Sequence, residues 1–100
     1  MSHDTQGSID TLLVHAGEPR PRINGAVSMP VFQSSTFEFG GDVGYHDIRY
    51  IRLNNTPNHD VLHAKLAALE RTEAALVASS GMAAISAALL TVLSPGDHLL

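Results

Sequence analysis

One segment of the chain places its leucines at helical spacing. Leu62, Leu66 and Leu69 stand at positions i, i+4 and i+7, which predicts an apolar stripe along a helix over about 58–71. Threonine and proline precede this segment at 56 and 57. Threonine is a good N-cap and proline suits the first helical position. The pattern therefore predicts a helix that begins directly after Thr56.

The next segments alternate between strand-like and helix-like patterns. An apolar run at 74–78 predicts a strand, and a second helix is predicted from Met82 to Leu93. The turn residues at 94–97 then lead into another apolar run. A strand, a helix and a strand in this spacing form a βαβ unit, which requires a parallel sheet covered by helices. The fold class that we expect is therefore α/β.

The second predicted helix is apolar almost all round. Apolar side chains such as Ile85, Leu89, Leu90 and Val92 do not gather on one face. A helix of this kind is normally buried on more than one side. We expect its partners to come from outside this segment.

The first 55 residues have a different character. Glycines and prolines interrupt any period, and a short helix over Ile9–His15 is the only regular element expected there. Such an arm buries few of its own side chains, so its order should depend on another surface. We therefore divide the chain into an extended arm, residues 1–55, and the start of an α/β domain, residues 56–100.

Composition and charge exclude several classes of protein. The formal net charge is −4 and the basic residues are scattered, which disfavours a nucleic-acid-binding protein. The sequence has no cysteine, so this segment can form neither a disulfide nor a thiolate zinc site. No apolar run is long enough for a membrane span, and the amino terminus lacks the pattern of a signal peptide. We expect no membrane partner and a cytoplasmic location.

The junction between the predicted strand and the second helix has the form of an anion site. Ser79, Ser80, Gly81 and Met82 stand where the helix begins. Unpaired backbone N–H groups and the positive end of the helix dipole meet at such a point. Glycine allows an oxygen to approach the backbone closely, and serine hydroxyls offer further donors. The pattern favours a phosphate group as the ligand.

A second group of candidate phosphate ligands lies about thirty residues earlier. The guanidinium of Arg52 can donate two hydrogen bonds to one anion, and the Tyr50 hydroxyl is a further donor. The two residues are two positions apart, so their side chains lie on the same side if the segment is extended. The alternative for this pair is a half-buried ring beside a solvated charge.

Several short motifs in order resemble one enzyme family. They are Thr11–Gly17, Tyr50–Pro57, Ser80–Ile85 and Ser94–Asp97. Together they resemble the amino-terminal part of the pyridoxal-phosphate (PLP) trans-sulfuration enzymes, which include cystathionine synthases and lyases, methionine gamma-lyase and O-acylhomoserine sulfhydrylases. The resemblance implies the aspartate aminotransferase-like fold of PLP-dependent transferases, of which this chain would hold the arm and the first βαβ unit of the large domain.

The resemblance also implies roles for particular residues. Tyr50 and Arg52 would grip the phosphate of a neighbouring subunit's cofactor, while the backbone amides of Gly81 and Met82 would hold the phosphate of their own. Arg49 would lie near the far end of the substrate. The implied partners are a sulfur amino acid or an O-acylated homoserine, and further copies of the chain in a homo-oligomer with shared active sites, a dimer or a dimer of dimers (homotetramer).

The resemblance further implies that this chain is the front portion of a longer enzyme. That enzyme would make or break a carbon–sulfur bond by elimination or replacement at the γ- or β-carbon. The Schiff-base lysine and the acid at the ring nitrogen should lie beyond Leu100, so no catalytic residue is expected here and the segment alone should be inactive. We interpret Lys65, the sole lysine, as an exposed helix residue. The family writes Asn-Pro-Thr where this chain has Asn55-Thr56-Pro57, so the local turn should differ.

Two alternatives come from other classes of protein. A non-catalytic helical interaction module would explain the apolar second helix by burial against a partner. A zinc hydrolase would use His59 and His63, which share one helical face as in H-E-x-x-H enzymes, with Asp60 in place of the glutamate. No third ligand stands at a recognisable spacing. The alternative for the two histidines is a pair of partly solvated rings on a surface helix.

Overall fold

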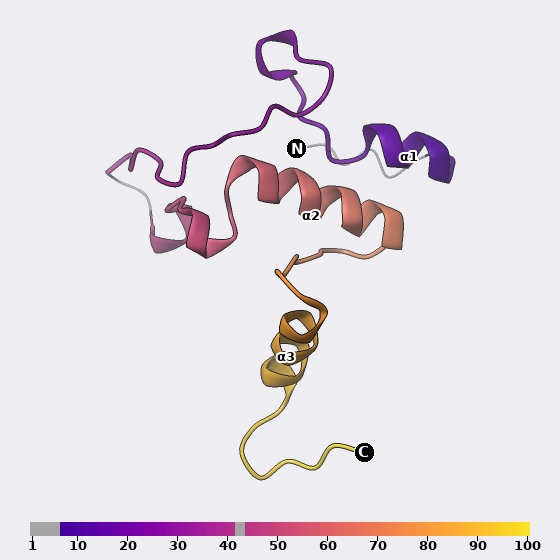
Figure 1. Ribbon diagram of the computed structural model, residues 1–100, viewed down its shortest axis with the longest axis vertical. Coiled ribbons are helices and arrows are strands. Elements are labelled where there is room, and N and C mark those ends of the chain that lie inside the picture. Colours follow the sequence, from indigo (N-terminus) through magenta and orange to yellow (C-terminus); the bar gives the residue numbers. More distant parts are fainter. Residues whose placement is uncertain (1–6, 42–43) are drawn as a thin grey trace.

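The structure, a computed structural model, describes residues 7–41 and 44–100. The α-helices of this part are α1 (Ile9–His15), α2 (Pro57–Glu70) and α3 (Gly81–Val92). Three short 3-10 turns lie between α1 and α2, namely η1 (Ile23–Gly25), η2 (Tyr45–Asp47) and η3 (Ile51–Leu53). Figure 1 shows α1 and α2 side by side, with α3 apart from both. No helix in the described ranges is both long and apolar enough to cross a membrane.

The helix predicted over about 58–71 is confirmed as α2. Thr56 is its N-cap and Pro57 its first residue, as the sequence predicted. At the other end Arg71 adopts the left-handed conformation with φ of 55°. The Thr72 N–H then donates to the Ala67 carbonyl at 2.9 Å. This arrangement pairs carbonyls that the end of a helix otherwise leaves free, which ends α2 in a defined place.

The predicted helix over Ile9–His15 is confirmed as α1, and it packs on α2. The N-cap Ser8 accepts a hydrogen bond from the Thr11 N–H at 3.4 Å. The small core between the two helices consists of Leu12 of α1, the C-cap residue Ala16 and Ala68 of α2, with Leu69 packed against it. Burial of these apolar surfaces holds the two helices together.

The fully buried residues of α2 do not include the leucines of the predicted apolar stripe. Its buried residues are the small ones, Val61, Ala64, Ala67 and Ala68, whereas Leu62 is 45% exposed. The reason is the close approach of the chain after α1. A Cβ added at Gly17 would lie 2.7 Å from the Val61 carbonyl oxygen and 2.8 Å from the Lys65 nitrogen. Only small side chains fit where two backbones come so near, which accounts for the alanines on this face, while Leu69 stays partly buried against the core.

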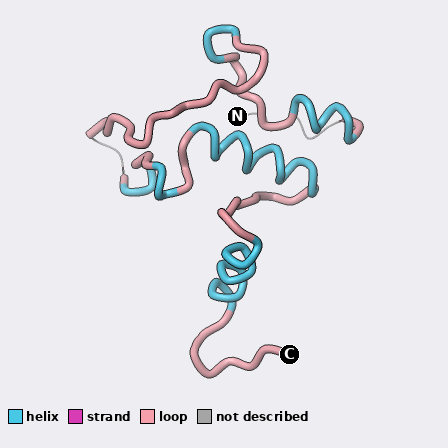
Figure 2. The backbone as a smooth tube through the Cα atoms, in the orientation of Figure 1, coloured by secondary structure: helices cyan, strands magenta, loops and turns pink. Residues whose placement is uncertain are grey.

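The helix predicted from Met82 to Leu93 is confirmed as α3, but no other described element covers it. Figure 2 shows helices and loops and no strand in the described residues, with α3 projecting away from α2. None of its side chains is buried. The segment 74–78 pairs with no strand in the described ranges, where the only isolated bridge is antiparallel and joins Thr36 to Tyr50. The βαβ unit therefore stays a prediction.

The arm buries little of itself, as the glycine and proline pattern predicted. No described residue between 18 and 55 is buried. The arm is held to α2 by Asn58, whose side chain accepts from the Phe32 N–H and donates to the Pro30 carbonyl, each at 2.8 Å. One amide thus supplies the donor and the acceptor that a neighbouring strand would otherwise supply.

Candidate functional site

The amino-terminal end of α3 offers free backbone donors. Ser80 is the N-cap, and its Oγ accepts from the Ala83 N–H at 3.1 Å while its carbonyl accepts from the Ala84 N–H at 3.1 Å. Within the described part of the chain, the N–H groups of Gly81 and Met82 have no hydrogen-bond partner. A Cβ added at Gly81 would meet no atom within 4 Å. The turn can therefore accept an anion against its backbone.

Tyr50 and Arg52 lie on a tight turn rather than on the extended segment that we predicted. Tyr50 is extended, but Ile51–Leu53 forms η3, in which the Leu53 N–H donates to the Tyr50 carbonyl at 2.9 Å. The two side chains still meet, because the Arg52 Cζ atom lies 5.6 Å from the centre of the Tyr50 ring. This is the range of a cation–π contact. The turn brings the two candidate phosphate ligands together on the surface.

The side chain of Asn55 closes this turn. It accepts from the Tyr50 N–H at 3.0 Å and donates to the Ile48 carbonyl at 2.7 Å. This role of Asn55 was not predicted from the sequence. The adjacent asparagines Asn54 and Asn55 could have indicated a turn here, since asparagine side chains readily form hydrogen bonds with nearby backbone in turns.

Arg49 is held in place by two acceptors. Its Nη1 donates to the Asn55 carbonyl at 2.6 Å and to Asp60 Oδ2 at 2.7 Å. The carboxylate offsets part of the positive charge of the guanidinium. The guanidinium still has donors left over, because arginine carries five N–H groups.

Asn54 connects the turn to the segment that leads into α3. Its backbone is left-handed with φ of 56°, and its Nδ2 donates to the Val77 carbonyl at 2.7 Å. No described hydrogen bond or ion pair joins the side chains of Tyr50 or Arg52 to the Gly81–Met82 turn of the same chain. The two sets of candidate phosphate-binding residues therefore lie on segments that the Asn54 side chain connects, and no described hydrogen bond or ion pair joins the two sets directly.

The histidine pair of α2 lacks the ligands of a zinc site. The rings of His59 and His63 lie 6.1 Å apart between centroids, and Thr56 Oγ1 is 2.7 Å from His59 Nδ1. No group of three His, Cys, Asp or Glu side chains that could hold a metal ion occurs in residues 7–41 and 44–100. The zinc-hydrolase alternative therefore has no third ligand in this part of the chain.

His63 is more enclosed than a surface histidine. Its Nε2 atom is buried and has no hydrogen-bond partner. Desolvation lowers the pKa of His63, the positive charge of His59 lowers it further, and Asp60 acts in the opposite direction. The arrangement favours a neutral ring.

Lys65 is not the exposed helix residue that we predicted. Its Nζ donates to the carbonyls of Leu13 and Val14 at 3.2 and 3.5 Å and to Glu18 Oε1 at 3.3 Å. Its side chain is only 23% exposed. The ammonium group satisfies carbonyls at the carboxyl end of α1, where a cation is favourable. The expectation failed because the periodicity of α2 did not reveal that α1 packs against it.

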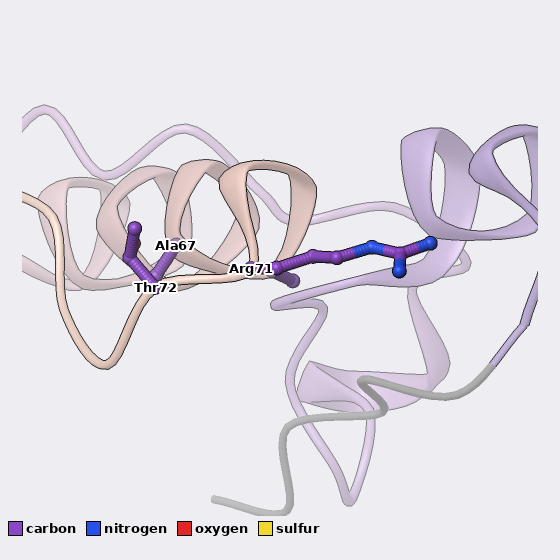
Figure 3. Close-up of a pocket in the computed structure, with 4 residues that line it drawn as sticks. Ala67, Arg71 and Thr72 are labelled. Carbon is purple, nitrogen blue, oxygen red and sulfur yellow. The ribbon is translucent and has the colours of Figure 1, made fainter.

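A pocket lies at the other end of α2, away from the Tyr50 turn. Ala67, Ala68, Arg71 and Thr72 line it, and Figure 3 shows the Arg71 side chain extended away from Ala67 and Thr72. Two methyl groups, a guanidinium and a hydroxyl include no imidazole, carboxylate or thiol, the side chains that most often act as acids and bases. This pocket is not a candidate for acid–base chemistry.

Comparison with known proteins identifies the family. The family described as Cys/Met metabolism PLP-dependent enzyme matches residues 10–100. An L-methionine gamma-lyase of Fusobacterium nucleatum subsp. polymorphum is 44% identical over 102 aligned residues, which cover 91% of this chain and 25% of that protein. A cystathionine gamma-synthase of Mycobacterium tuberculosis is 42% identical over 90 residues, covering 89% and 23%. The chain spans about a quarter of the length of these curated relatives. The chain therefore belongs to the Cys/Met metabolism PLP-dependent enzyme family.

Proposed function

We propose that this chain is the amino-terminal part of a PLP-dependent enzyme that makes or breaks a carbon–sulfur bond of a sulfur amino acid. The family match over residues 10–100 supports this proposal, together with relatives named methionine gamma-lyase and cystathionine gamma-synthase. The substrate would be a sulfur amino acid or an O-acylated homoserine. A cytoplasmic location stays a prediction.

The observation that carries the proposal is the open turn at the start of α3. The amides of Gly81 and Met82 would hold the cofactor phosphate, because they have no described partner and no side chain fills the space at Gly81. The Ser80 hydroxyl accepts from Ala83 and keeps its own hydrogen for a further bond. When bound, PLP supplies the electron sink that stabilises negative charge on the substrate. The residues of this segment would only bind and orient it.

Tyr50 and Arg52 would hold the phosphate of a cofactor in a neighbouring subunit. The Arg52 side chain is exposed, and no described acidic group pairs with it. The arm that carries both residues buries little of its own surface, which suits a segment that lies against another copy. We therefore propose a homo-oligomer with shared active sites, a dimer or a dimer of dimers, in which residues 1–55 are the contacting arm.

The proposal also gives roles to the remaining elements of this segment. Segment 74–78 and α3 would belong to the first βαβ unit of an α/β domain that begins at Thr56. Lys65 is engaged at the end of α1 and would not be the lysine that bonds to the cofactor. Arg49 would lie near the distal end of the substrate, with Asp60 tempering its charge.

The test is the affinity of the full-length protein for PLP. Replacing Arg52 with alanine removes a charge-assisted contact, so PLP binding should weaken by about 2 kcal/mol. Equilibrium dialysis with the visible absorption of bound PLP measures this effect. Arg20→Ala is the matched control, since Arg20 is an exposed arginine of the same arm. A full-length protein that binds no PLP would overturn the proposed function, and unchanged affinity in Arg52→Ala would remove the role of Arg52.

A further inference from the structure

Asn54 connects the turn that carries Tyr50 and Arg52 to the segment that leads into α3. It ends η3 directly after Leu53, and its backbone N–H donates to the Ile51 carbonyl at 3.2 Å. Its side chain donates to the carbonyl of Val77, which lies two residues before Ser79. A single partly buried hydrogen bond thus spans 23 residues of sequence.

The backbone conformation of Asn54 makes this bond possible. A φ of 56° lies in the left-handed region, which asparagine tolerates better than most residues other than glycine. Glycine would adopt the same backbone but has no side chain to donate. Asparagine is therefore suited both to end the turn and to fasten it to a neighbouring segment.

The turn itself is already held closed by other groups. The Asn55 side chain bonds to the backbone of Ile48 and Tyr50, and the Arg49 guanidinium bonds to the Asn55 carbonyl. None of these bonds reaches the segment before α3. The Asn54 side chain supplies that connection.

We propose that Asn54 is a positioning residue that fixes the Tyr50–Arg52 turn relative to the segment leading into Gly81 and Met82. The inference rests on the proposed function, in which both turns bind cofactor phosphate. Charge-assisted bonds from a guanidinium depend on its position and direction. Without the Asn54 amide, the turn can shift against the segment 74–78, and Arg52 loses part of its fixed placement.

Two substitutions separate the amide from the backbone conformation. Asn54→Gly keeps the left-handed backbone and removes the donor. Asn54→Asp keeps the size of the side chain and sets a carboxylate against the Val77 carbonyl, which replaces attraction with repulsion. We expect the affinity of the full-length protein for PLP to fall about fivefold in Asn54→Gly, and further in Asn54→Asp.

Asn24 provides the matched control. Its φ is 49°, it is exposed, and no side-chain hydrogen bond of Asn24 is described. Asn24→Gly and Asn24→Asp should leave PLP affinity unchanged. Thermal unfolding of every variant, measured without PLP, separates a loss of cofactor contact from a loss of fold.

A double-mutant cycle with Arg52→Ala tests whether Asn54 acts through the turn. If it positions Arg52, Asn54→Gly should weaken PLP binding much less in the Arg52→Ala background than in the natural chain. The same fold-change in both backgrounds, or no change in either, would overturn the positioning role while leaving the proposed function intact. Unchanged affinity in Arg52→Ala alone would instead count against the phosphate contact itself.

Discussion

At the scale of single residues, His63 shows how enclosure alters chemistry. Two histidines one turn apart look alike in the sequence, yet they differ in the structure. His59 has the Thr56 hydroxyl as a partner, whereas the buried Nε2 of His63 has none. A charged imidazolium needs partners for both ring N–H groups, and Nε2 has none among the described residues, so the fold favours the neutral ring of His63.

The lowered pKa of His63 predicts a loss of stability in acid. Below its ordinary value of 6.5, the unfolded chain takes up a proton before the folded chain does, so the free energy of unfolding falls as the pH falls through and below that value. Above it both states are neutral and nothing is lost. His63→Gln in the full-length protein should therefore show a smaller drop in melting temperature between pH 8 and pH 5.5. His46→Gln, at an exposed ring on η2, is the control, and an equal drop in both variants would contradict the prediction.

The candidate phosphate ligands could be predicted from residue types, but the hydrogen bonds that hold them in place could not. Glycine before an apolar helix indicated the anion site, and the family resemblance implied that Tyr50 and Arg52 bind phosphate. The supports depend on bonds between distant segments, such as Asn54 to Val77 and Asn58 to Pro30. An asparagine in a sequence favours a turn without revealing which carbonyl its side chain reaches. Such partners become known only when the chain path is known.

At the scale of elements, helix positions were predicted to within one residue at each end, because caps and prolines are local signals. The residues that α2 buries against α1 could not be predicted from the leucine spacing. Periodicity locates the most apolar stripe, whereas the contact with α1 is decided by how closely the backbones approach. At Gly17 that approach leaves no room for a Cβ, so the alanines of α2 form the contact.

Gly17 therefore predicts a large effect of one methyl group. Gly17→Ala would place the new carbon 2.7 Å from the Val61 carbonyl oxygen, at a φ of 75° that alanine seldom adopts. We expect the free energy of unfolding of the full-length protein to fall by about 3 kcal/mol, from overpacking and backbone strain together. Denaturant titration measures the change.

Gly25 is the control for the backbone part of this effect. Its φ is 76°, and a Cβ there would meet no atom within 4 Å. Gly25→Ala should therefore lose only about 1 kcal/mol, the strain of the left-handed backbone. Equal losses at the two glycines would show that the contact of α1 with α2 has no part in the result.

At the scale of the whole molecule, the three helices differ in whether they need partners from outside the segment. The contact of α1 with α2 forms a core within the segment. Helix α3 exposes large apolar side chains, with Met82 at 68% and Leu90 at 78%. A soluble protein rarely leaves such a helix uncovered. The pattern of the sequence predicted this need for partners. Under the proposed function the rest of a longer enzyme would supply them, since the relatives extend over about four times this length.

The same substitution in α3 should therefore have opposite effects in two contexts. Leu90→Glu in these hundred residues expressed alone should reduce self-association and the binding of a hydrophobic dye, because it places a charge on an exposed apolar helix. In the full-length protein we expect the rest of the α/β domain to cover Leu90, so the buried carboxylate should lower the free energy of unfolding by about 3 kcal/mol. Leu90→Met, which stays apolar, should change little in either context. Light scattering of the short chain and denaturant titration of the long one measure the pair. A full-length Leu90→Glu protein as stable as its parent would mean that α3 stays exposed, which favours an interaction module over a buried helix of the enzyme domain.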